Sequence, residues 1–441
     1  MKKSLYIFFT AFCVYAFNAA YSQEKLTLND AITAALNNNT GIVKNTNSIS
    51  SYQADVKSAY GNLLPNLSVS GGFGWQRVSD NGGTKQIDYF GNLQTIGASQ
   101  VDSRSWSVSA GGNVTLFDGL SNIASISKSK ADLESAKLNL EKMRQDVVLQ
   151  TVGLYTQIIS NQKLLNFQEE DFNYNKGLLD RVKQMYNLKM VPVSDVYSQE
   201  AQEANSQVAY LQAKNDLEKS KINLLNYLSI DISKNYQFDS TAATINDSSL
   251  INSNIEDLYE YALKNRADYQ GMKYQQESVN NQLTIARSGL FPRLSGNYSF
   301  SSNAVEPSNL FDRKVYSLGL SLNIPIFSNF NTEASIEAAK VQVENNDEDL
   351  KTLELSIRSD VKSADLDLQT AKQQLDASDA ALKASKESWQ IKKETYSLGS
   401  ITFLDLQQAY NNYLQAQYNK INNDYKYLVA QYTLLNSIGK Y

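Results

Sequence analysis

The sequence has one cysteine and no histidine among its 441 residues. The cysteine, Cys13, lies in a short apolar run that follows Lys2 and Lys3 and precedes a small-residue cleavage site ending at Ser22. Residues 1–22 are therefore predicted to be a secretory signal. The mature chain is then expected to hold neither cysteine nor histidine, which excludes disulfides, thiol chemistry and every site that needs histidine.

Three further absences narrow the class of protein. No other apolar stretch approaches 18 residues, so no membrane-spanning helix is predicted. No basic block occurs and the net charge is -5, which argues against nucleic-acid binding. No nucleotide motif, redox centre or carboxylate constellation is visible, so we expect no enzyme, no cofactor and no metal centre. A purely carboxylate site for a hard cation stays open.

What the sequence does contain is an internal repeat with a constant offset. Four pairs of like residues each lie 210 positions apart: Phe117 and Phe327, Tyr186 and Tyr396, Asp195 and Asp405, and Asn226 and Asn436. The first structural repeat is predicted over residues 23–228 and the second over 255–441, with a linker at 229–254. Each repeat is expected to contain a helix, a β-hairpin, a long helix and a returning helix.

The long helices are predicted at residues 121–188 and 331–398, and the returning helices at 193–228 and 403–438. The second long segment has no glycine or proline, and its apolar residues recur every seven positions with small residues three later. This pattern is typical of a coiled-coil seam. At 1.5 Å per residue, each long helix would span about 100 Å.

Two shorter helices are predicted at residues 26–64 and 255–291, each starting at a helix-capping pair. The capping pairs are Thr27 with Asp30 and Asn254 with Asp257. A short helix and a returning helix placed end to end would match one long helix in length. The lengths therefore indicate a cylinder wall of uniform height.

Four segments alternate apolar and polar residues, and they form two predicted β-hairpins at residues 66–117 and 294–327. The strands are 66–78, 104–117, 294–304 and 315–327. One apolar and one polar face over about ten residues is the signature of an outer-membrane barrel strand, and it also fits a half-buried strand of a soluble sandwich.

Four strands cannot close a barrel, and an open sheet edge is not tolerated in lipid. Several chains must then pool their strands, and three copies would give twelve, although neither the strands nor the helices alone determine that number. The predicted fold class is an α+β membrane protein: a trimeric, twelve-stranded β-barrel with four strands per chain, continued by a long α-helical coiled-coil barrel.

The junctions and helix tips resemble those of the TolC family of outer-membrane efflux proteins over nearly the whole mature length. The matching segments are Asn62 to Leu67, Gly289 to Leu294, Leu116 to Gly119, Pro325 to Asn329, Tyr186 to Val196, Tyr396 to Leu406, and Leu26 to Ile32. Each motif is weak alone, but the junction and tip motifs occur in order and twice.

The resemblance implies a homotrimer whose barrel sits in outer-membrane lipid and whose helical tunnel crosses the periplasm. It implies docking of a periplasmic adaptor protein and an inner-membrane pump, of the RND, ABC or a similar class. The expected function is passive conduction of cargo in a tripartite efflux or type I secretion system. The alternative is a non-channel coiled-coil structural protein of the periplasm or cell surface, and the cargo is not identified.

The resemblance also assigns tip residues. Asp405 matches a family aspartate that rings the closed mouth, while Gln408 stands where the family has a second aspartate. The other reading of Asp405 is an ordinary solvated carboxylate at a helix start. Contact with the adaptor is expected at the tips. The contact residues are Leu188, Val191, Gly399 and Ile401.

Asp195 with Tyr396 resembles a family latch between neighbouring hairpin tips. The alternative is that Asp195 or Ser194 is a helix N-cap after Pro192. Ile401 replaces the arginine of a second family latch, and Lys189 stands where the first tip of the family has glycine.

Four aromatic residues of the strands could form a belt at the membrane interface or pack between protomers. They are Trp75, Trp106, Tyr298 and Tyr316.

Overall fold

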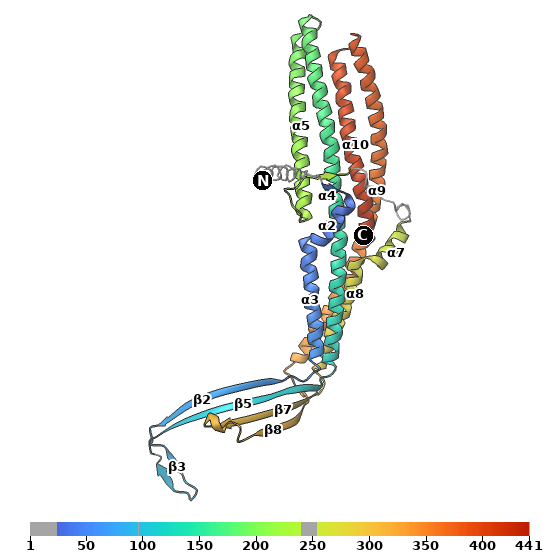
Figure 1. Cartoon of the computed structure of the whole chain (residues 1–441). Helices are drawn as coiled ribbons and strands as arrows, with labels where there is room; N and C mark the ends of the chain where they lie inside the picture. Colours follow the sequence, from blue (N-terminus) through green and yellow to red (C-terminus); the bar gives the residue numbers. More distant parts are fainter. Residues whose placement is uncertain (1–23, 96, 240–253, 441) are drawn as a thin grey trace, which may run out of the picture. The chain divides into compact units, whose positions relative to one another are not determined.

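The computed structural model describes residues 24–95, 97–239 and 254–440, so the predicted signal at residues 1–22 lies outside the described residues (Figure 1). The chain divides into two compact units. The helical unit comprises the described residues within Met1–Ile49, Ala136–Met272 and Leu350–Tyr441. The sheet unit comprises those within Ser50–Ser135 and Lys273–Asp349.

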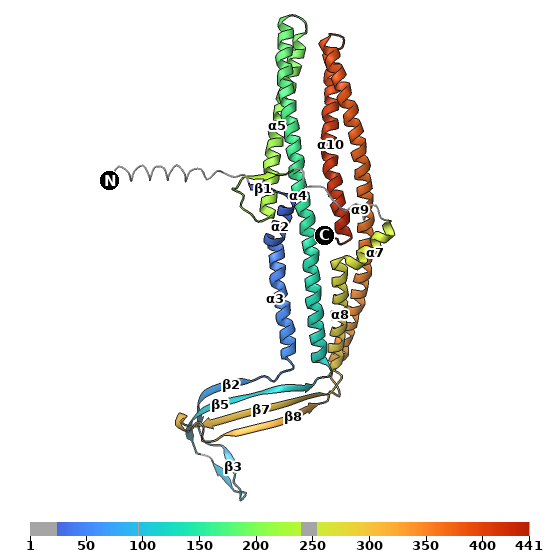
Figure 2. The ribbon, with the colours of Figure 1, turned by 45° about the vertical axis from the view of Figure 1, so that its right-hand side comes forward.

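Two helical hairpins of equal size dominate the helical unit (Figures 1 and 2). Helix α4 (Ser121–Asn187) and helix α9 (Asn331–Ser397) each have 67 residues. Helix α5 (Val193–Tyr227) and helix α10 (Phe403–Ser437), which return from them, each have 35. Each predicted range ends one residue beyond the observed helix. The first residues of α4 and α9 belong to the sheet unit.

The repeat is visible in the backbone itself. Four pairs of residues with positive φ lie 210 positions apart: Gly119 and Asn329, Leu120 and Phe330, Lys189 and Gly399, and Ser229 and Gly439. Leucine, phenylalanine, lysine and serine rarely adopt this conformation. Its recurrence at equivalent positions shows that both copies make the same turns at both ends of their hairpins.

The two short helices of the repeats are each broken in two, so the prediction of single helices over residues 26–64 and 255–291 is wrong. The first consists of α2 (Leu28–Asn38) and α3 (Thr40–Gly61), and the second of α7 (Ile255–Asn265) and α8 (Ala267–Ser288). The breaks fall at Asn39 and Arg266, 227 positions apart. Both residues lie outside the helical region, with ψ of 122° at Asn39 and 123° at Arg266, which interrupts the helix for one residue.

The predicted caps of these helices have different outcomes. Thr27 and Asp30 form a complete capping box on α2, as predicted. Asn254 is the N-cap residue of α7, but its side chain makes no capping hydrogen bond, so that part of the prediction is wrong. At the first break, the Asn39 side chain accepts a hydrogen bond from the backbone N–H of Gly41 at 2.9 Å.

Two hydrophobic clusters hold the helical unit together, one per repeat. The first joins α2, α4 and α5, and the second joins α7, α9 and α10. Three pairs of their buried members again correspond at an offset of 210: Leu224 and Leu434, Leu225 and Leu435, and Leu228 and Ile438. Fully burying a leucine stabilises the fold by about 2 kcal/mol, so these triplets anchor the C-terminal ends of α5 and α10.

A small parallel sheet of β1 (Glu24–Leu26) and β6 (Tyr236–Phe238) ties the start of the described chain to the predicted linker. Tyr155 of α4 is fully buried beneath it. Its hydroxyl donates to the backbone carbonyl of Leu26 at 2.9 Å and accepts from the backbone N–H of Asp239 at 3.1 Å. Burial raises the pKa of Tyr155 to about 12, because the phenolate is disfavoured away from water.

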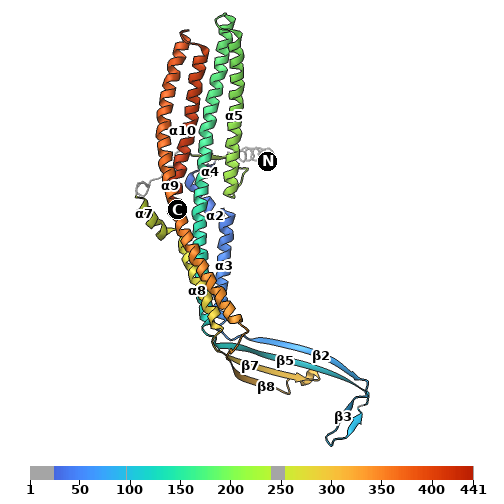
Figure 3. The same cartoon turned by 180° about the vertical axis from the view of Figure 1, so that it is seen from behind.

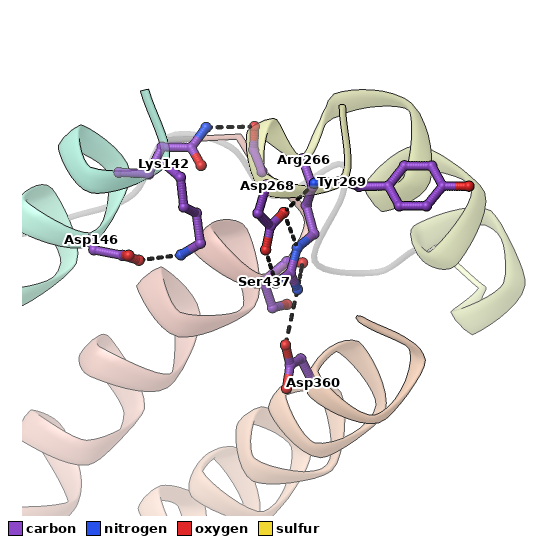
Figure 4. Close-up of polar contacts among 9 residues, drawn as sticks. Lys142, Asp146, Arg266, Asp268, Tyr269, Asp360 and Ser437 are labelled. Atoms are coloured by element: carbon purple, nitrogen blue, oxygen red, sulfur yellow. Dashed lines mark hydrogen bonds and ion pairs between the residues drawn. The ribbon is translucent and has the colours of Figure 1, made fainter. Parts of the chain in front are cut away.

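The second helix break is held by a buried ion cluster (Figure 4). Arg266 is only 6% exposed. Its Nη2 and Nε donate to the two carboxylate oxygens of Asp268 at 2.7 and 3.1 Å, and its Nη1 donates to Asp360 of α9 and to the backbone carbonyl of Ser437. Burial alone would raise the pKa of Asp268, but the guanidinium lowers it overall. The cluster joins the α7–α8 break to α9 and to the end of α10.

The sheet unit contains one four-stranded antiparallel sheet in the order β2-β5-β7-β8 (Figures 2 and 3). The strands are β2 (Ser68–Asp80), β5 (Ser99–Phe117), β7 (Arg293–Ala304) and β8 (Val315–Asn323). Strand β8 ends four residues earlier than predicted, because Pro325 cannot donate to the ladder. The predicted first loop carries a small hairpin of β3 (Lys85–Ile87) and β4 (Leu93–Thr95).

The register places most apolar residues of the four strands on one face. Val69 pairs with Ala110, Ala110 with Phe300, and Phe300 with Tyr316. The opposite face is built largely from serine, glycine and asparagine, as in the row Ser68, Gly111, Ser299 and Ser317. The predicted two-faced alternation is confirmed.

Within the described part of the chain, no helix is both long and apolar enough to cross a membrane.

Candidate functional site

The two hairpin tips are the candidate site that the sequence singled out. The first tip joins α4 to α5 and the second joins α9 to α10. Each long helix ends in a turn in which the residue at positive φ donates its N–H three residues back, Lys189 to Tyr186 at 2.8 Å and Gly399 to Tyr396 at 2.9 Å. The tips thus share one backbone geometry, which glycine adopts without strain in the second and lysine adopts with strain in the first.

Asp405 lies in the first turn of α10 and forms a capping box with Thr402. Its carboxylate accepts from the Thr402 hydroxyl at 2.6 Å, and its backbone N–H donates to that hydroxyl oxygen at 3.2 Å. These hydrogen bonds from Thr402 lower the pKa of Asp405. Gln408, one turn further, is exposed and donates to Asn412. The single chain thus presents an ionised carboxylate at a fixed place on the tip. The predicted ring of carboxylates stays a prediction.

Asp195 lies in the first turn of α5, where the N-cap residue is Pro192 and no side chain caps the helix. The alternative prediction that Asp195 or Ser194 is the N-cap is therefore wrong. The Ser194 hydroxyl instead contacts the Asp195 carboxylate at 3.3 Å. This arrangement leaves carboxylate oxygens of Asp195 available to a partner beyond its own helix end.

The hydroxyl of Tyr396 is buried and has no hydrogen-bond partner among the described residues. Burial, and secondarily the charge of Asp195, raises the pKa of Tyr396. Its side chain lines a cavity of about 210 Å³ between the two hairpins, together with Tyr174, Arg181 and Lys393. The single chain therefore brings Asp195 and Tyr396 near each other without joining them, and the latch stays a prediction.

The tips expose large apolar side chains to solvent. Leu188 is 72% exposed, whereas Val191 and Ile401 are half-buried. Three further exposed residues were not assigned to the contact surface from the sequence: Met190, Leu398 and Leu404. Exposed apolar side chains gathered at a helix end are typical of a surface that binds another protein.

Below the tips, the structure shows a buried polar chain that sequence reasoning missed. Asp171 of α4 accepts from the Tyr410 hydroxyl of α10 at 2.6 Å and from the Asn175 side chain at 2.8 Å. Gln199 of α5 donates in turn to Asn175 at 3.1 Å. All four side chains are buried. One signal was available, because Asn175 is a large polar residue at a position that the heptad pattern of α9 gives to small residues.

An aromatic cluster surrounds this polar chain and joins the two hairpins. Tyr174 of α4 lies 4.3 Å from the ring of Tyr410 and 5.6 Å from that of Trp389. Trp389 of α9 also stacks on Tyr413 of α10 at 5.0 Å. Trp389 is thus a packing residue of the contact between the hairpins.

The apolar face of the sheet is the second functional surface. Trp75 and Tyr316 are 54% and 75% exposed on it. Trp106 packs on Phe73 at 4.6 Å, and Tyr316 packs on Phe300 at 5.2 Å. These rings gather on one side of the sheet, as the belt prediction requires, but their place at a membrane interface stays a prediction.

Tyr298 differs from the other three aromatic residues. Its hydroxyl donates to the backbone carbonyl of Asn66, across the strand that holds Gly112. A side chain at Gly112 would collide with that Asn66 segment, so glycine is required there. Tyr298 therefore fastens the start of β2 to β7.

Within the described ranges, no three histidine, cysteine, aspartate or glutamate side chains come together as a metal site. The chain combines a two-faced antiparallel sheet with long paired helices whose tips expose apolar side chains. These features together are typical of one class, the outer-membrane proteins that contain both β-strands and long helical hairpins.

The chain belongs to the outer membrane efflux protein family, whose sequence model matches residues 31–229 and 258–440. The outer membrane protein TolC of Vibrio cholerae is 21% identical over 304 residues, which cover 67% of this chain and 68% of TolC. The outer membrane efflux protein BepC of Brucella suis is 20% identical over 333 residues, which cover 74% of this chain and 71% of BepC.

Solved structures show the same fold. The outer membrane protein VceC of Vibrio cholerae superposes with a TM-score of 0.79 at 14% identity, covering 93% of this chain and 96% of VceC. The MtrE outer membrane channel of Neisseria gonorrhoeae, solved in an open state, superposes with a TM-score of 0.73 at 17% identity, covering 93% of this chain and 88% of MtrE. The predicted family is therefore confirmed, and so is the predicted combination of antiparallel strands and long helices in one chain. The closed twelve-stranded barrel and the trimer stay predictions.

Proposed function

We propose that this protein is the outer-membrane duct of an export system, and that three copies form one channel. The observation that carries the proposal is the four-stranded sheet, which has an apolar face and two open edges, β2 and β8. The backbone N–H and C=O groups along an open edge have no hydrogen-bond partner in lipid, and each such group costs several kcal/mol. Pairing β8 of one copy with β2 of the next removes every edge and gives twelve strands.

In this assembly the two repeats, residues 23–228 and 255–441, act as structural repeats of one wall joined by the segment 229–254. The apolar sheet face would meet lipid. The serine-rich face would line the lumen. Trp75, Trp106 and Tyr316 would lie at the membrane interface. The paired hairpins would continue the duct into the periplasm.

The tips are the proposed docking end. Their exposed apolar side chains, with Gly399 and Ile401 at the second turn, would contact a periplasmic adaptor and the inner-membrane pump. Asp405 from each copy would face the narrow axis and favour cations. Asp195 of one tip would accept from Tyr396 of a neighbouring tip, which would satisfy a hydroxyl that has no partner among the described residues. Conduction itself is passive, because the pump supplies the energy.

The test compares two neighbouring residues of β8 that face opposite ways. Leu320, 74% exposed, lies on the apolar face and Ser321 on the polar face. We expect Leu320→Lys to lose about 2–4 kcal/mol of stability if that face meets lipid, whereas Ser321→Lys keeps its charge in water. Heat-resistant oligomers in outer-membrane extracts should therefore disappear for Leu320→Lys alone.

Comparison with Ser321→Lys decides whether the loss of oligomers comes from a charge on the apolar face or from any new charge on β8. Equal amounts of assembled protein for both variants, or recovery of the wild type only from the soluble fraction, would contradict a lipid-facing sheet. Such a result would favour the coiled-coil structural alternative. Wild-type protein reconstituted in planar bilayers should also conduct.

A further inference from the structure

The charged side chains on the apolar face of the sheet all lie at one end of it. Within the ranges of strands β2, β5, β7 and β8, three charged residues occupy this face: Arg77, Asp102 and Arg104. Arg104 lies opposite Trp75, and Asp102 lies opposite Arg77 in the next row toward the β2–β5 loop. From Trp106 down to the end where β2 and β7 begin, the residues of these strands on this face are uncharged.

The uncharged stretch has the height of a membrane. On β7 this face runs from Leu294, which pairs with Leu322, to Ala304, which pairs with Trp106. These positions lie about 34 Å apart along the strand, or about 25 Å apart across a bilayer if the strand is tilted by about 40°. The apolar band of an outer-membrane barrel is about 25 Å tall. Arg104 lies two residues beyond Trp106, so it would reach the level of the lipid headgroups.

The two arginines differ in the partners that they already have. Arg77 donates from Nε and Nη2 to the two carboxylate oxygens of Asp102 at 2.6 and 2.8 Å, and its guanidinium lies 5.4 Å from the centre of the Trp75 ring. Arg104 is exposed, and among the described residues no hydrogen bond or ion pair engages its guanidinium. Because Asp102 is held by Arg77, the N–H donors of Arg104 are available to another partner.

We propose that Arg104, with Trp75 beside it, binds a phosphate group on the headgroup of an outer-leaflet lipid. The guanidinium is a planar fork of N–H donors that matches phosphate oxygens. Residues 99–105 of β5 pair with β2 but with no other strand in the described part of the chain, so a headgroup can approach from the β7 side. A lipid fits better than a free phosphate ion, because the site continues directly into the apolar face. The inference rests on the proposed function in placing this face in outer-membrane lipid.

The test is titration of the full mature protein, extracted from outer membranes in mild detergent, with bisphosphorylated lipid A. Native mass spectrometry measures the fraction of protein that carries lipid. Arg104→Gln keeps most of the stem and removes the charge, so the affinity should fall roughly tenfold or more, as for a lost hydrogen bond to a charged group. Arg293→Gln is the matched control, because Arg293 is exposed on the polar face of β7, and this variant should bind as wild type.

Asp102→Asn should have the opposite effect. It removes the carboxylate that repels phosphate and that occupies the guanidinium of Arg77, so the affinity for lipid A should rise. Damage to the fold would lower the affinity instead, so the sign separates a binding role from a structural one. A fall for Asp102→Asn, an unchanged affinity for Arg104→Gln or an equal fall for Arg293→Gln would overturn the proposal.

Two further probes separate a lipid site from a site for phosphate alone. Lipid A without its phosphates should bind wild type no better than it binds Arg104→Gln. Inorganic phosphate at the same concentration as lipid A should not displace the lipid. Displacement by inorganic phosphate, or full-affinity binding of the phosphate-free lipid, would overturn the proposal. Absence of the wild-type protein from outer-membrane extracts would refute the proposed function, and this inference with it.

Discussion

The contacts of Arg266 allow a quantitative prediction of how much one buried side chain stabilises the helical unit. Replacing it by methionine keeps most of the side-chain volume but removes five N–H donors. The bidentate pair with Asp268 is lost, and so is the bond to the backbone carbonyl of Ser437. The charge of Lys142 also lowers the pKa of Asp268, but the Lys142 ammonium forms its ion pair with Asp146.

The magnitude follows from the burial of the two partners. Breaking a buried ion pair by removing one member costs about 3–5 kcal/mol. The side chain of Asp268 is 21% exposed, so water recovers part of its charge and the lower end of that range applies. Asp360 is 47% exposed and adds little. We therefore expect Arg266→Met to lower the free energy of unfolding by about 3 kcal/mol.

Arg358→Met is the matched control, because it makes the same substitution on α9. Arg358 lies 3.7 Å from Glu256, but both side chains are more than half exposed. Exposed pairs contribute about 0–1 kcal/mol. Unfolding would be followed by circular dichroism during guanidinium titration in detergent. Equal midpoints for the two variants would refute the reasoning.

The stability at low pH is a second test of the ion pair between Arg266 and Asp268. Because Arg266 lowers the folded pKa of Asp268, its contribution is present above the unfolded value near 4 and is lost as the pH falls through the folded value. The difference in stability between wild type and Arg266→Met should therefore shrink below about pH 4. A difference that stays constant down to pH 2 would show that the ion pair is not its source.

Three further predictions concern the small sheet and the tips. Tyr155→Phe should cost about 1–3 kcal/mol, seen as faster hydrogen exchange at Leu26 and Phe238. Because the folded pKa of Tyr155 is raised to about 12, the Tyr155 hydroxyl stabilises the fold below pH 10, and this stabilisation is lost between pH 10 and about pH 12. Tyr155→Phe should therefore lose less stability than wild type in that interval. Identical alkaline unfolding curves for the two proteins would argue against this role. Gly399→Lys should lower the free energy of unfolding and Lys189→Gly should raise it, each by about 1 kcal/mol, because both positions have positive φ. The melting temperature should shift in the same directions, and opposite signs would contradict the strain. Asp405→Asn should reduce cation preference in bilayers while Thr402→Ala, which removes the cap but not the charge, should not; unchanged selectivity in Asp405→Asn would count against a carboxylate ring.

The repeat explains why so much of the fold could be predicted from the sequence. The offset of 210 between Tyr186 and Tyr396 reappears as the offset between Lys189 and Gly399, which share one turn geometry. Likewise, strict alternation in residues 316–322 predicted which face each side chain occupies, because the strand period is two. Both signals are patterns of residue type along the chain, so they can be recognised in one sequence without a structure.

The breaks at Asn39 and Arg266 could not be predicted in the same way. A one-residue interruption leaves the apolar pattern on either side nearly in register, so periodicity reads the two helices as one. The capping role of the Asn39 side chain depends on this backbone break, and the Arg266 cluster depends on partners as far away as Ser437.

The candidate site likewise combines local features, which the sequence predicts, with contacts between distant residues, which it does not. Capping of α10 by Thr402 and Asp405 is local and three residues long, whereas Asp171 and Tyr410 are 239 residues apart. Contacts between copies, such as a carboxylate ring or a latch to a neighbouring tip, form only on assembly and leave no local pattern in the sequence of one chain.

Native mass spectrometry of protein extracted from outer membranes in mild detergent tests the central claim most directly. The account predicts a single dominant species with the mass of three mature chains, because only pooled strands leave no open edge. A species with the mass of one chain, stable after extraction from the envelope, would contradict it.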